Sequence, residues 1–438
     1  MRKYTVVIQA GGMGTRMREL TEDKIPKPML KLNGKPLIEW QMDNMAEYGF
    51  RDFVIIVGHL GEKICEYYGD GSNLSYNIRY IMEDTPLGSA GSLYNLNEMG
   101  IDNDIILLYG DVMFCIEWDR ALRFHKSHGG KVTLFVHPNT HPHDSDLVEI
   151  NDDGLVTGIL YKNEDRKPWQ NNCVNAGLYV IDKTIIKDMP EAKKNDLERD
   201  IITPIINSNK VYAYKTPEYI KDVGTPDRFF LAEREQRSGL WDRKCLRNKQ
   251  SCVFLDRDGT LNIYKGLIDD IDKLELEKGA ACAIRKLNDA GILAIVVTNQ
   301  PVVARGMCDI GDVQEIHKKL QTLLGKEGAY LDDIVFCPHH PDKGYPEENK
   351  AYKMRCNCRK PNTGMIDRMV DKYNIDISKS FIIGDSTVDI MTGINAGLET
   401  ILLETGQKGQ DGKYEVEADK YYNNILDAVV YIISNKKG

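Results

Sequence analysis

The sequence has no low-complexity tract, no long apolar run and no excess of positive charge. Of its 438 residues, 42% are apolar and 28% are charged, and the formal net charge is -9. This composition is typical of a globular protein that folds over nearly its whole length. No basic stripe is present, so we expect small-molecule partners and neither nucleic acid nor a membrane. The longest apolar runs, such as residues 292–297, are too short to span a bilayer.

Signals for export are also missing. The first residues lead directly into a strand pattern, without a charged leader, an apolar segment or a cleavage site, which predicts a cytoplasmic protein. Ten cysteines in so long a chain do not indicate a disulfide framework. Three of them lie beside a histidine between residues 337 and 358, and this cluster indicates a metal site instead.

The alternation of short and long segments predicts the fold class. Runs of β-branched residues alternate with segments of helical period, which is typical of parallel sheets covered by helices. Seven strands are predicted: residues 6–10, 53–57, 105–109, 132–136, 252–255, 292–297 and 380–383. The chain is too long for one core, and the charged stretch 232–250 has no strand pattern. We therefore expect two doubly wound α/β domains, residues 1–239 and 240–438.

A glycine-rich turn follows the first predicted strand. Gly11, Gly12 and Gly14 lie in the run Gly-Gly-Met-Gly-Thr-Arg, where backbone N–H groups can approach phosphate oxygens closely. The run matches neither an NTPase P-loop nor a dinucleotide fingerprint. A plain strand-to-helix turn is the alternative. Lys27, held between two prolines, can meet phosphate at small entropic cost.

Six ordered motifs between residues 2 and 235 resemble the sugar nucleotidyltransferase family. They are the glycine-rich run, Pro-Lys-Pro at 26–28, Pro-Leu-Gly-Ser-Ala-Gly at 86–91, Gly-Asp at 110–111, Asn-Ala-Gly at 175–177 and Asp-Val-Gly-Thr-Pro at 222–226. The resemblance implies a Rossmann-like domain in which a sugar 1-phosphate attacks the α-phosphate of a nucleoside triphosphate and pyrophosphate leaves. Such chemistry depends on positioning and on positive charge around the phosphates.

The resemblance also implies roles for individual residues. Asp111 and Asp222 hold Mg²⁺, and the cations Arg16 and Lys27 hold the triphosphate. The nucleotide contacts are Gly11, Gly12, Gly14, Thr15, Glu83, Pro86 and Gly88. The sugar contacts are Lys162, Asn175, Gly177 and Glu198. A solvated surface charge is an equal alternative for Lys162 and for Glu198.

Residues 83–91 resemble the guanylyltransferases of mannose 1-phosphate and of D-glycero-D-manno-heptose 1-phosphate more than the thymidylyl branch. The carboxylate of Glu83 can accept hydrogen bonds from N1–H and N2–H of guanine, a donor pair that uracil and thymine lack. This favours GTP as the nucleotide. An exposed charge at a strand end is the alternative interpretation of Glu83.

The second half begins with a pair of aspartates. Asp256 and Asp258 lie in Asp-Arg-Asp-Gly-Thr-Leu-Asn, directly after the predicted strand 252–255. This spacing suits a nucleophile that forms an aspartyl-phosphate and an acid–base group that serves the leaving oxygen and then water. A calcium loop is disfavoured because no ladder of acidic residues follows. The motif resembles the first motif of haloacid-dehalogenase (HAD) phosphatases.

Further HAD motifs follow in order over residues 250–433, and the resemblance implies their roles. The phosphoryl group is held by Thr298 and Lys360. Mg²⁺ is held by Asp256, Asp385 and the carbonyl of Asp258, with Asp389 in support. Other contacts to the phosphorylated substrate are Asn299, Arg305 and Arg359. Pro-Val-Val at 301–303 departs from the usual Ser-Gly-Ile/Val of the family.

The cysteine cluster supplies three thiolates and one imidazole for a closed tetrahedral zinc site: Cys337, His339, Cys356 and Cys358. Iron in place of zinc, a nucleic-acid module and buried reduced cysteines are the alternatives. Because Arg359 and Lys360 directly follow the last ligand, we expect zinc to order the phosphate-binding lysine. The cluster looks like the branch of D-glycero-D-manno-heptose 1,7-bisphosphate 7-phosphatases, which is shared with histidinol phosphatases.

The two resemblances imply consecutive reactions. Removal of the 7-phosphate leaves a heptose 1-phosphate, which a guanylyltransferase would convert to GDP-heptose for lipopolysaccharide or S-layer glycans. One alternative is GDP-mannose formation joined to an unrelated phosphatase, such as one for histidinol phosphate. Another is a scaffold or sensor with one silent domain. The sequence leaves open whether the chain forms a homo-oligomer.

Overall fold

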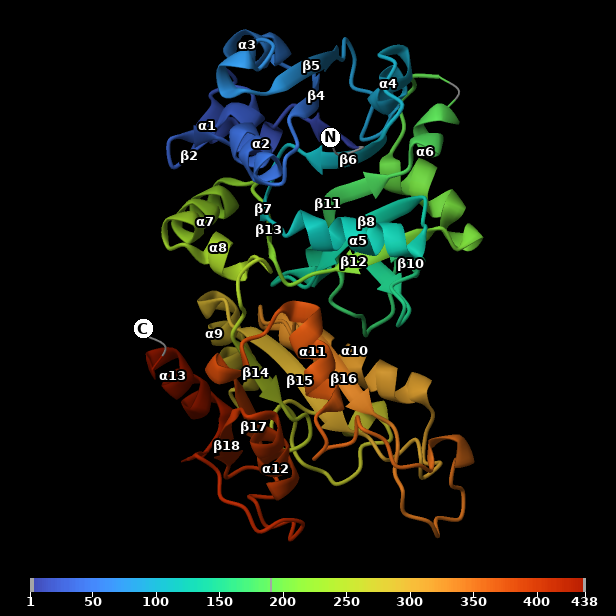
Figure 1. The fold of residues 1–438 in the computed structure, drawn as a ribbon, viewed down its shortest axis with the longest axis vertical. Coiled ribbons are helices and arrows are strands. Elements are labelled where there is room, and N and C mark those ends of the chain that lie inside the picture. Colours follow the sequence, from blue (N-terminus) through green and yellow to red (C-terminus); the bar gives the residue numbers. More distant parts are fainter. Residues whose placement is uncertain (1–3, 190, 436–438) are drawn as a thin grey trace. The chain divides into compact units, whose positions relative to one another are not determined.

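The computed structural model describes residues 4–189 and 191–435, which form two compact units (Figure 1). The first unit comprises Met1–His137, Asp146–Tyr161 and Val174–Cys245. The second comprises Pro138–Ser145, Lys162–Cys173 and Leu246–Gly438. Within the described ranges, no helix has the length and apolar character needed to cross a bilayer.

A mixed nine-stranded sheet forms the first unit. Its main path is β10 (Val156–Leu160), β9 (Leu147–Ile150), β11 (Val174–Ile181), β6 (Asp104–Tyr109), β1 (Tyr4–Gln9), β4 (Asp52–Val57) and β5 (Asn77–Met82), with β8 (Val132–His137) beside β11 and β12 (Val211–Lys215) beside β8. β1 is parallel to β4 and β6, as predicted, but β11 is antiparallel to β6 and β8. The described chain has no α-helix between β8 and β11 that could serve as a parallel crossover. This sheet is therefore mixed, with parallel central strands, and it belongs to the predicted α/β class.

Short strand pairs and helices complete this unit. The pairs are β2 (Lys31–Leu32) with β3 (Lys35–Pro36) and β7 (Val112–Cys115) with β13 (Tyr219–Asp222). The helices are α1 (Arg18–Thr21), α2 (Leu37–Glu47), α3 (Gly61–Tyr68), α4 (Asn95–Glu98), α5 (Trp118–His128), α6 (Lys183–Lys187), α7 (Pro226–Arg237) and α8 (Leu240–Lys244). α2 and α5 bury their apolar faces in the main core.

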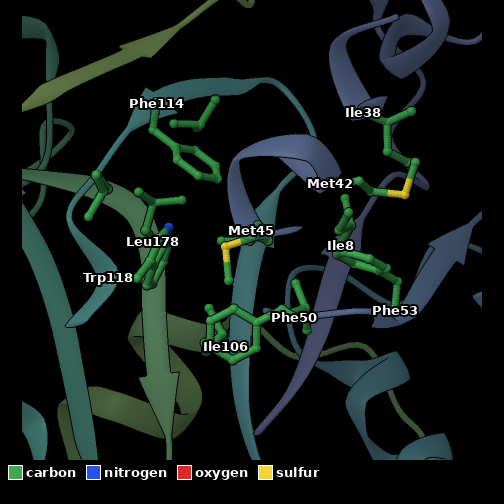
Figure 2. Packing of buried hydrophobic residues seen from close by; sticks show 14 of the residues in the cluster. Ile8, Ile38, Met42, Met45, Phe50, Phe53, Ile106, Phe114, Trp118 and Leu178 are labelled. Atoms are coloured by element: carbon green, nitrogen blue, oxygen red, sulfur yellow. The ribbon is translucent and has the colours of Figure 1, made fainter. Parts of the chain in front are cut away.

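The core of the first unit lies between the central strands and these helices. Figure 2 shows Ile8 of β1 and Ile106 of β6 beside Met42 and Met45 of α2, with Trp118 of α5 nearby. All five side chains are fully buried. Strands β1, β4 and β6 have apolar side chains on both faces, as expected for parallel strands covered by helices. The loops at their carboxyl ends therefore have a rigid support.

The second unit contains a six-stranded, fully parallel sheet. Its order is β16 (Asp333–Cys337), β15 (Leu293–Asn299), β14 (Cys252–Leu255), β17 (Phe381–Gly384), β18 (Glu399–Leu403) and β19 (Lys420–Tyr422). The helices are α9 (Ala280–Ala290), α10 (Ile310–Lys326), α11 (Gly364–Tyr373), α12 (Thr387–Ala396) and α13 (Ile425–Asn435). Alternate residues of β14 enter two separate cores, so both faces of the sheet are covered. The prediction of a doubly wound parallel sheet is confirmed.

The contacts place the division between the units later than residues 239/240. Helix α8 stays with the first unit because the Trp241 ring stacks on Tyr219, with ring centroids 4.9 Å apart. Two loops of the first half group with the second unit. In one of them the backbone N–H of Gln170 donates to Thr322 of α10 at 2.9 Å. Composition alone could not reveal these side-chain contacts.

Helix α9 provides a test of the second core. Leu287 is fully buried in it, whereas the neighbouring Lys286 is exposed. We expect Leu287→Ala to lower the free energy of unfolding by about 2–5 kcal/mol, because the substitution leaves a cavity. Lys286→Ala should change it by less than about 0.5 kcal/mol. Urea denaturation measures both, and equal effects of the two variants would show that this helix does not pack as described.

Candidate active sites

The glycine-rich turn connects β1 to the first short helical turn. Gly14 has φ of 58°, in the left-handed region that favours glycine. A Cβ on Gly11 would lie 2.5 Å from Oε2 of Glu83, so the Glu83 carboxylate would have to move to admit a side chain there. The turn forms one wall of a cavity of about 330 Å³, which is also lined by Arg16, Lys27 and Asp111.

Two cations meet in this cavity. The Nζ of Lys27 lies 2.6 Å from Oδ2 of Asp111, and the lysine side chain is nine-tenths buried. A Cβ on Gly224 would lie 3.1 Å from Nη2 of Arg16 and 3.2 Å from Nζ of Lys27. The structure thus brings Arg16 and Lys27 together, as needed for binding a triphosphate, although they are separated in the sequence.

The pairing of β7 with β13 brings Asp222 next to Asp111. Val112 pairs with Asp222, and the N–H of Val223 donates to the carbonyl of Asp111 at 2.8 Å. Carboxylate oxygens suit Mg²⁺, so both residues fit the predicted metal. The Asp222 carboxylate accepts from Gly224 N–H at 2.5 Å and from Arg228 at 2.8 Å. Sequence analysis missed Arg228, because an arginine in an amphipathic helix carries no distinctive signal.

A buried network surrounds Glu198. The side chain accepts hydrogen bonds from Asn175 at 3.0 Å, from Tyr109 at 3.2 Å and from Tyr179. Burial raises the pKa of Glu198, and it raises the pKa of both tyrosines above their ordinary value. Glu198 is therefore no solvated surface charge, and that alternative is wrong. A Cβ on Gly177 would lie 2.8 Å from the Tyr109 ring, so a side chain at that position would crowd this network.

The other predicted ligands of this half occupy different surroundings. Glu83 accepts from the Ser92 hydroxyl, and the Gly88 carbonyl accepts from Gln9 at 3.2 Å. Pro86 is exposed. Lys162 lies in a loop that groups with the second unit, where its Nζ is 3.9 Å from Asp144. The role of Lys162 in sugar binding remains a prediction.

Three aspartates converge at the carboxyl edge of the parallel sheet in the second unit. Asp256 follows β14, Asp385 follows β17, and Asp389 lies in the first turn of α12. Each carboxylate has an oxygen within 4.8 Å of the others, and all three residues are buried. Lys360 lies among them, with Nζ 2.7 Å from Asp256 and 2.5 Å from Asp389.

The charges of this cluster do not balance. Three carboxylates face one ammonium group, which leaves an excess of negative charge that a divalent cation can balance. Burial, together with the neighbouring carboxylates, raises the pKa of Asp256 to about 6 and that of Asp385 to about 8. Burial alone would lower the pKa of Lys360, but Asp256 and Asp389 raise it above its ordinary value. The residues therefore fit the predicted Mg²⁺ site.

Asp258 is held beside this cluster by three side chains, one of which is Asn262, whose amide donates to it at 3.1 Å. Arg257, which is fully buried, donates to both of its oxygens at 2.9 and 3.0 Å. Gln300 donates to Asp258 at 2.9 Å and to the Thr298 hydroxyl at 3.0 Å. The structure thus links the predicted acid–base residue to a predicted phosphoryl ligand. Sequence analysis gave Gln300 no role.

The backbone of Lys360 is held in place by Asn299. The Asn299 amide donates to the Lys360 carbonyl at 3.1 Å and accepts from the Lys360 N–H at 3.0 Å. The Gln407 N–H in turn donates to Asp385 at 2.7 Å. Gly406 lies so close to Asp385 that any side chain there would collide with the carboxylate. The 405–411 loop therefore helps to orient Asp385, which sequence analysis did not anticipate.

The four predicted zinc ligands come together as expected. Their sulfur and nitrogen atoms lie 3.1–3.6 Å apart in the pairs Cys356 with Cys358, Cys337 with Cys358, Cys337 with Cys356, Cys358 with His339 and Cys337 with His339. Atoms this close can all reach one ion at about 2.0–2.3 Å. Arg359 donates to the His339 carbonyl at 2.9 Å. A metal here would fix the segment that leads into Lys360.

Comparisons with known families agree with the predicted pair of enzyme classes. A model described as Nucleotidyl transferase matches residues 5–239, more than half of the chain, and a HAD-hydrolase-like model matches residues 357–428. The chain belongs to the nucleotidyl transferase family. Its second half also belongs to a HAD phosphatase family, because it is 37% identical over 185 residues to the D-glycero-beta-D-manno-heptose-1,7-bisphosphate 7-phosphatase of Haemophilus ducreyi. That match covers 42% of this chain and 98% of the relative.

Two further matches concern the nucleotidyl transferase half. The mannose-1-phosphate guanylyltransferase of Mycobacterium tuberculosis is 29% identical over 243 residues, covering 55% of this chain and 67% of that protein. The crystal structure of HddC from Yersinia pseudotuberculosis complexed with GMP-PN is 25% identical, with a TM-score of 0.45, covering 53% of this chain and 99% of that chain. That TM-score is too low to support an inference. The chain is thus an enzyme with a nucleotidyltransferase half and a phosphatase half.

The raised pKa values of the aspartate cluster predict how Mg²⁺ binding depends on pH. A carboxyl whose pKa is raised from 3.8 on folding stabilises the folded chain at pH values below 3.8. This contribution is lost as the pH rises through the folded pKa, which is about 6 for Asp256 and about 8 for Asp385. Mg²⁺ binds only the ionised groups and offsets this loss. We therefore expect the increase in Tm caused by Mg²⁺ to grow from pH 5.5 to 8.5.

The matched variant is Asp385→Asn, which should largely remove this pH dependence. Differential scanning fluorimetry at several Mg²⁺ concentrations measures the effect. An increase in Tm that is independent of pH in the unaltered chain would contradict the assigned cluster.

Proposed function

We propose that this chain catalyses two consecutive steps of GDP-heptose formation. It hydrolyses the 7-phosphate of D-glycero-D-manno-heptose 1,7-bisphosphate and transfers GMP from GTP to the resulting heptose 1-phosphate. The observation that carries the proposal is the phosphatase half, which matches a named heptose bisphosphate phosphatase over nearly its full length. The product of that reaction is a sugar 1-phosphate, the substrate class of a sugar nucleotidyltransferase.

The phosphatase step follows from the aspartate cluster. A carboxylate oxygen of Asp256 attacks phosphorus, the bond to the sugar oxygen breaks, and Asp258 protonates that oxygen. Water then attacks the aspartyl-phosphate while Asp258 accepts its proton, which restores both carboxyl groups. Lys360 and Thr298 hold the phosphoryl oxygens. Mg²⁺ held by Asp256 and Asp385 would balance the charge on those oxygens.

The transferase step depends on Arg16 and Lys27. Their charges meet in one cavity, where they can stabilise the negative charge that develops around the α-phosphate as pyrophosphate leaves. Mg²⁺ held by Asp111 and Asp222 would supply further positive charge. Asn175 and Glu198 are held rigidly by the tyrosine network, which suits them to bind sugar hydroxyls. Glu83 would accept hydrogen bonds from guanine.

The remaining parts of the proposal concern cofactors and location. Zinc in the cysteine cluster would be structural, and Mg²⁺ would serve both reactions. The enzyme would act in the cytoplasm on nucleotide and sugar phosphates, for the synthesis of cell-surface glycans. The second candidate is mannose 1-phosphate as the transferase substrate, which is favoured by the named guanylyltransferase relative.

Two variants separate the reactions. Asp256→Asn removes the nucleophile, so we expect phosphate release to fall at least about 1,000-fold while GMP transfer to supplied heptose 1-phosphate continues. Lys27→Met should leave phosphate release unchanged and lower GMP transfer by about 100-fold or more. Phosphate and pyrophosphate assays measure the two steps, with both anomers supplied. Transfer to mannose 1-phosphate in preference to either heptose anomer would support the second candidate instead.

The role of Glu83 predicts a loss of base selectivity. We expect Glu83→Gln to reduce the preference for GTP over dTTP by about 10- to 100-fold, since one carboxylate can accept from two guanine donors. Asp84→Asn, which alters the exposed neighbouring carboxylate, is the control and should keep the preference. The measurement is the ratio of kcat/KM values for the two nucleotides. Equal selectivity in both variants would exclude Glu83 from base recognition.

A further inference from the structure

Two cations share one aromatic ring beside the phosphatase site. The guanidinium of Arg305 lies 4.5 Å from the centroid of the Tyr345 ring, and Nζ of Lys353 lies 5.0 Å from the same centroid. Arg305 follows the turn that begins at Gln300, the residue that donates to Asp258. Lys353 lies on the segment that leads through the zinc cluster to Lys360. Each of the two cations therefore lies on a segment that also contains a residue of the proposed phosphatase site.

The two segments are packed tightly against each other. The N–H of Asn349 donates to the carbonyl of Ala304 at 3.0 Å. Gly306 lies so close to the Glu347 carbonyl that a side chain at that position would collide with it. These contacts fix the position of Tyr345 and of the two cations around it.

The hydrogen-bonding capacity of this cluster is not satisfied. The side chain of Lys353 is 5% exposed, and its Nζ has no hydrogen-bond partner in the described parts of the chain. Glu348 is 3.3 Å away as an ion pair, but its Oε2 also lacks a hydrogen bond. The buried Nε of Arg305 has no partner either. A buried ammonium group that makes an ion pair but no hydrogen bond is incompletely satisfied, and a bound anion would supply the missing acceptors.

We propose that Lys353 and Tyr345 complete, with Arg305, a subsite for the non-reacting phosphate of a sugar bisphosphate. The proposal rests on the proposed phosphatase function and deepens it. Arg305 and Lys353 supply two cations to one dianion, and the Tyr345 ring holds them at a fixed separation. The reacting phosphate binds at Asp256, so this second contact makes a bisphosphate a better substrate than a monophosphate with the same reacting group.

The test compares heptose 1,7-bisphosphate with heptose 7-phosphate, which keeps the reacting phosphate and lacks the other. We expect Lys353→Met to lower kcat/KM for the bisphosphate by about 10- to 100-fold, mostly through KM, and to leave the value for the monophosphate unchanged. Lys350→Met, on an exposed residue of the same segment, should alter neither value. Glu348→Gln removes the competing carboxylate and should not weaken bisphosphate binding.

The outcomes separate the subsite from the proposed function. If Lys353→Met and Glu348→Gln both lower kcat/KM equally for the two substrates, the ion pair has only a structural role. That result would overturn the subsite. No loss on either substrate would overturn it as well. If the unaltered enzyme prefers another bisphosphate, such as fructose 1,6-bisphosphate, the heptose assignment fails. In that case a selective loss with that bisphosphate in Lys353→Met would still support the subsite.

Discussion

The contact of Lys360 with Asp256 and Asp389 is the interaction on which the phosphatase half depends. Parallel strands end at one edge of the sheet, so the acids that follow β14 and β17 must meet there. Without a cation between them, three buried carboxylates would repel one another. Lys360 supplies that cation, and Asn299 holds the backbone of the lysine through two hydrogen bonds. The position of one ammonium group therefore connects the fold of the sheet with the proposed chemistry.

The transferase half also brings acidic residues close to cations, but it does so with different elements. Its acids lie on the β7–β13 pair, and its cations come from the glycine-rich turn and the proline-stiffened segment after it. Asp111 has Lys27 as its counter-ion, and Asp222 has Arg228. In the phosphatase half Asp256 and Asp389 share Lys360, whereas Asp385 accepts a hydrogen bond from the Gln407 N–H and has no cation partner among the described residues. This arrangement suits enzymes whose substrates carry several negative charges.

Much of this could be predicted from the sequence because the signals are local. All seven predicted strands are present within about two residues, and the predicted zinc ligands and the aspartates of the HAD motifs meet as expected. The roles of Tyr109, Tyr179 and Arg228 could not be predicted, since tertiary packing alone brings them to Glu198 and Asp222. The antiparallel β11 and the two loops that join the second unit depend on contacts distant in sequence.

The order of the two reactions is the central claim, and a phosphorus NMR time course tests it most directly. The purified chain is mixed with heptose 1,7-bisphosphate, GTP and Mg²⁺, and all phosphorus signals are followed together. The account predicts that inorganic phosphate and heptose 1-phosphate appear before pyrophosphate, and that the final nucleotide sugar carries no phosphate monoester. Pyrophosphate released first, with a nucleotide sugar that still carries the 7-phosphate, would contradict it.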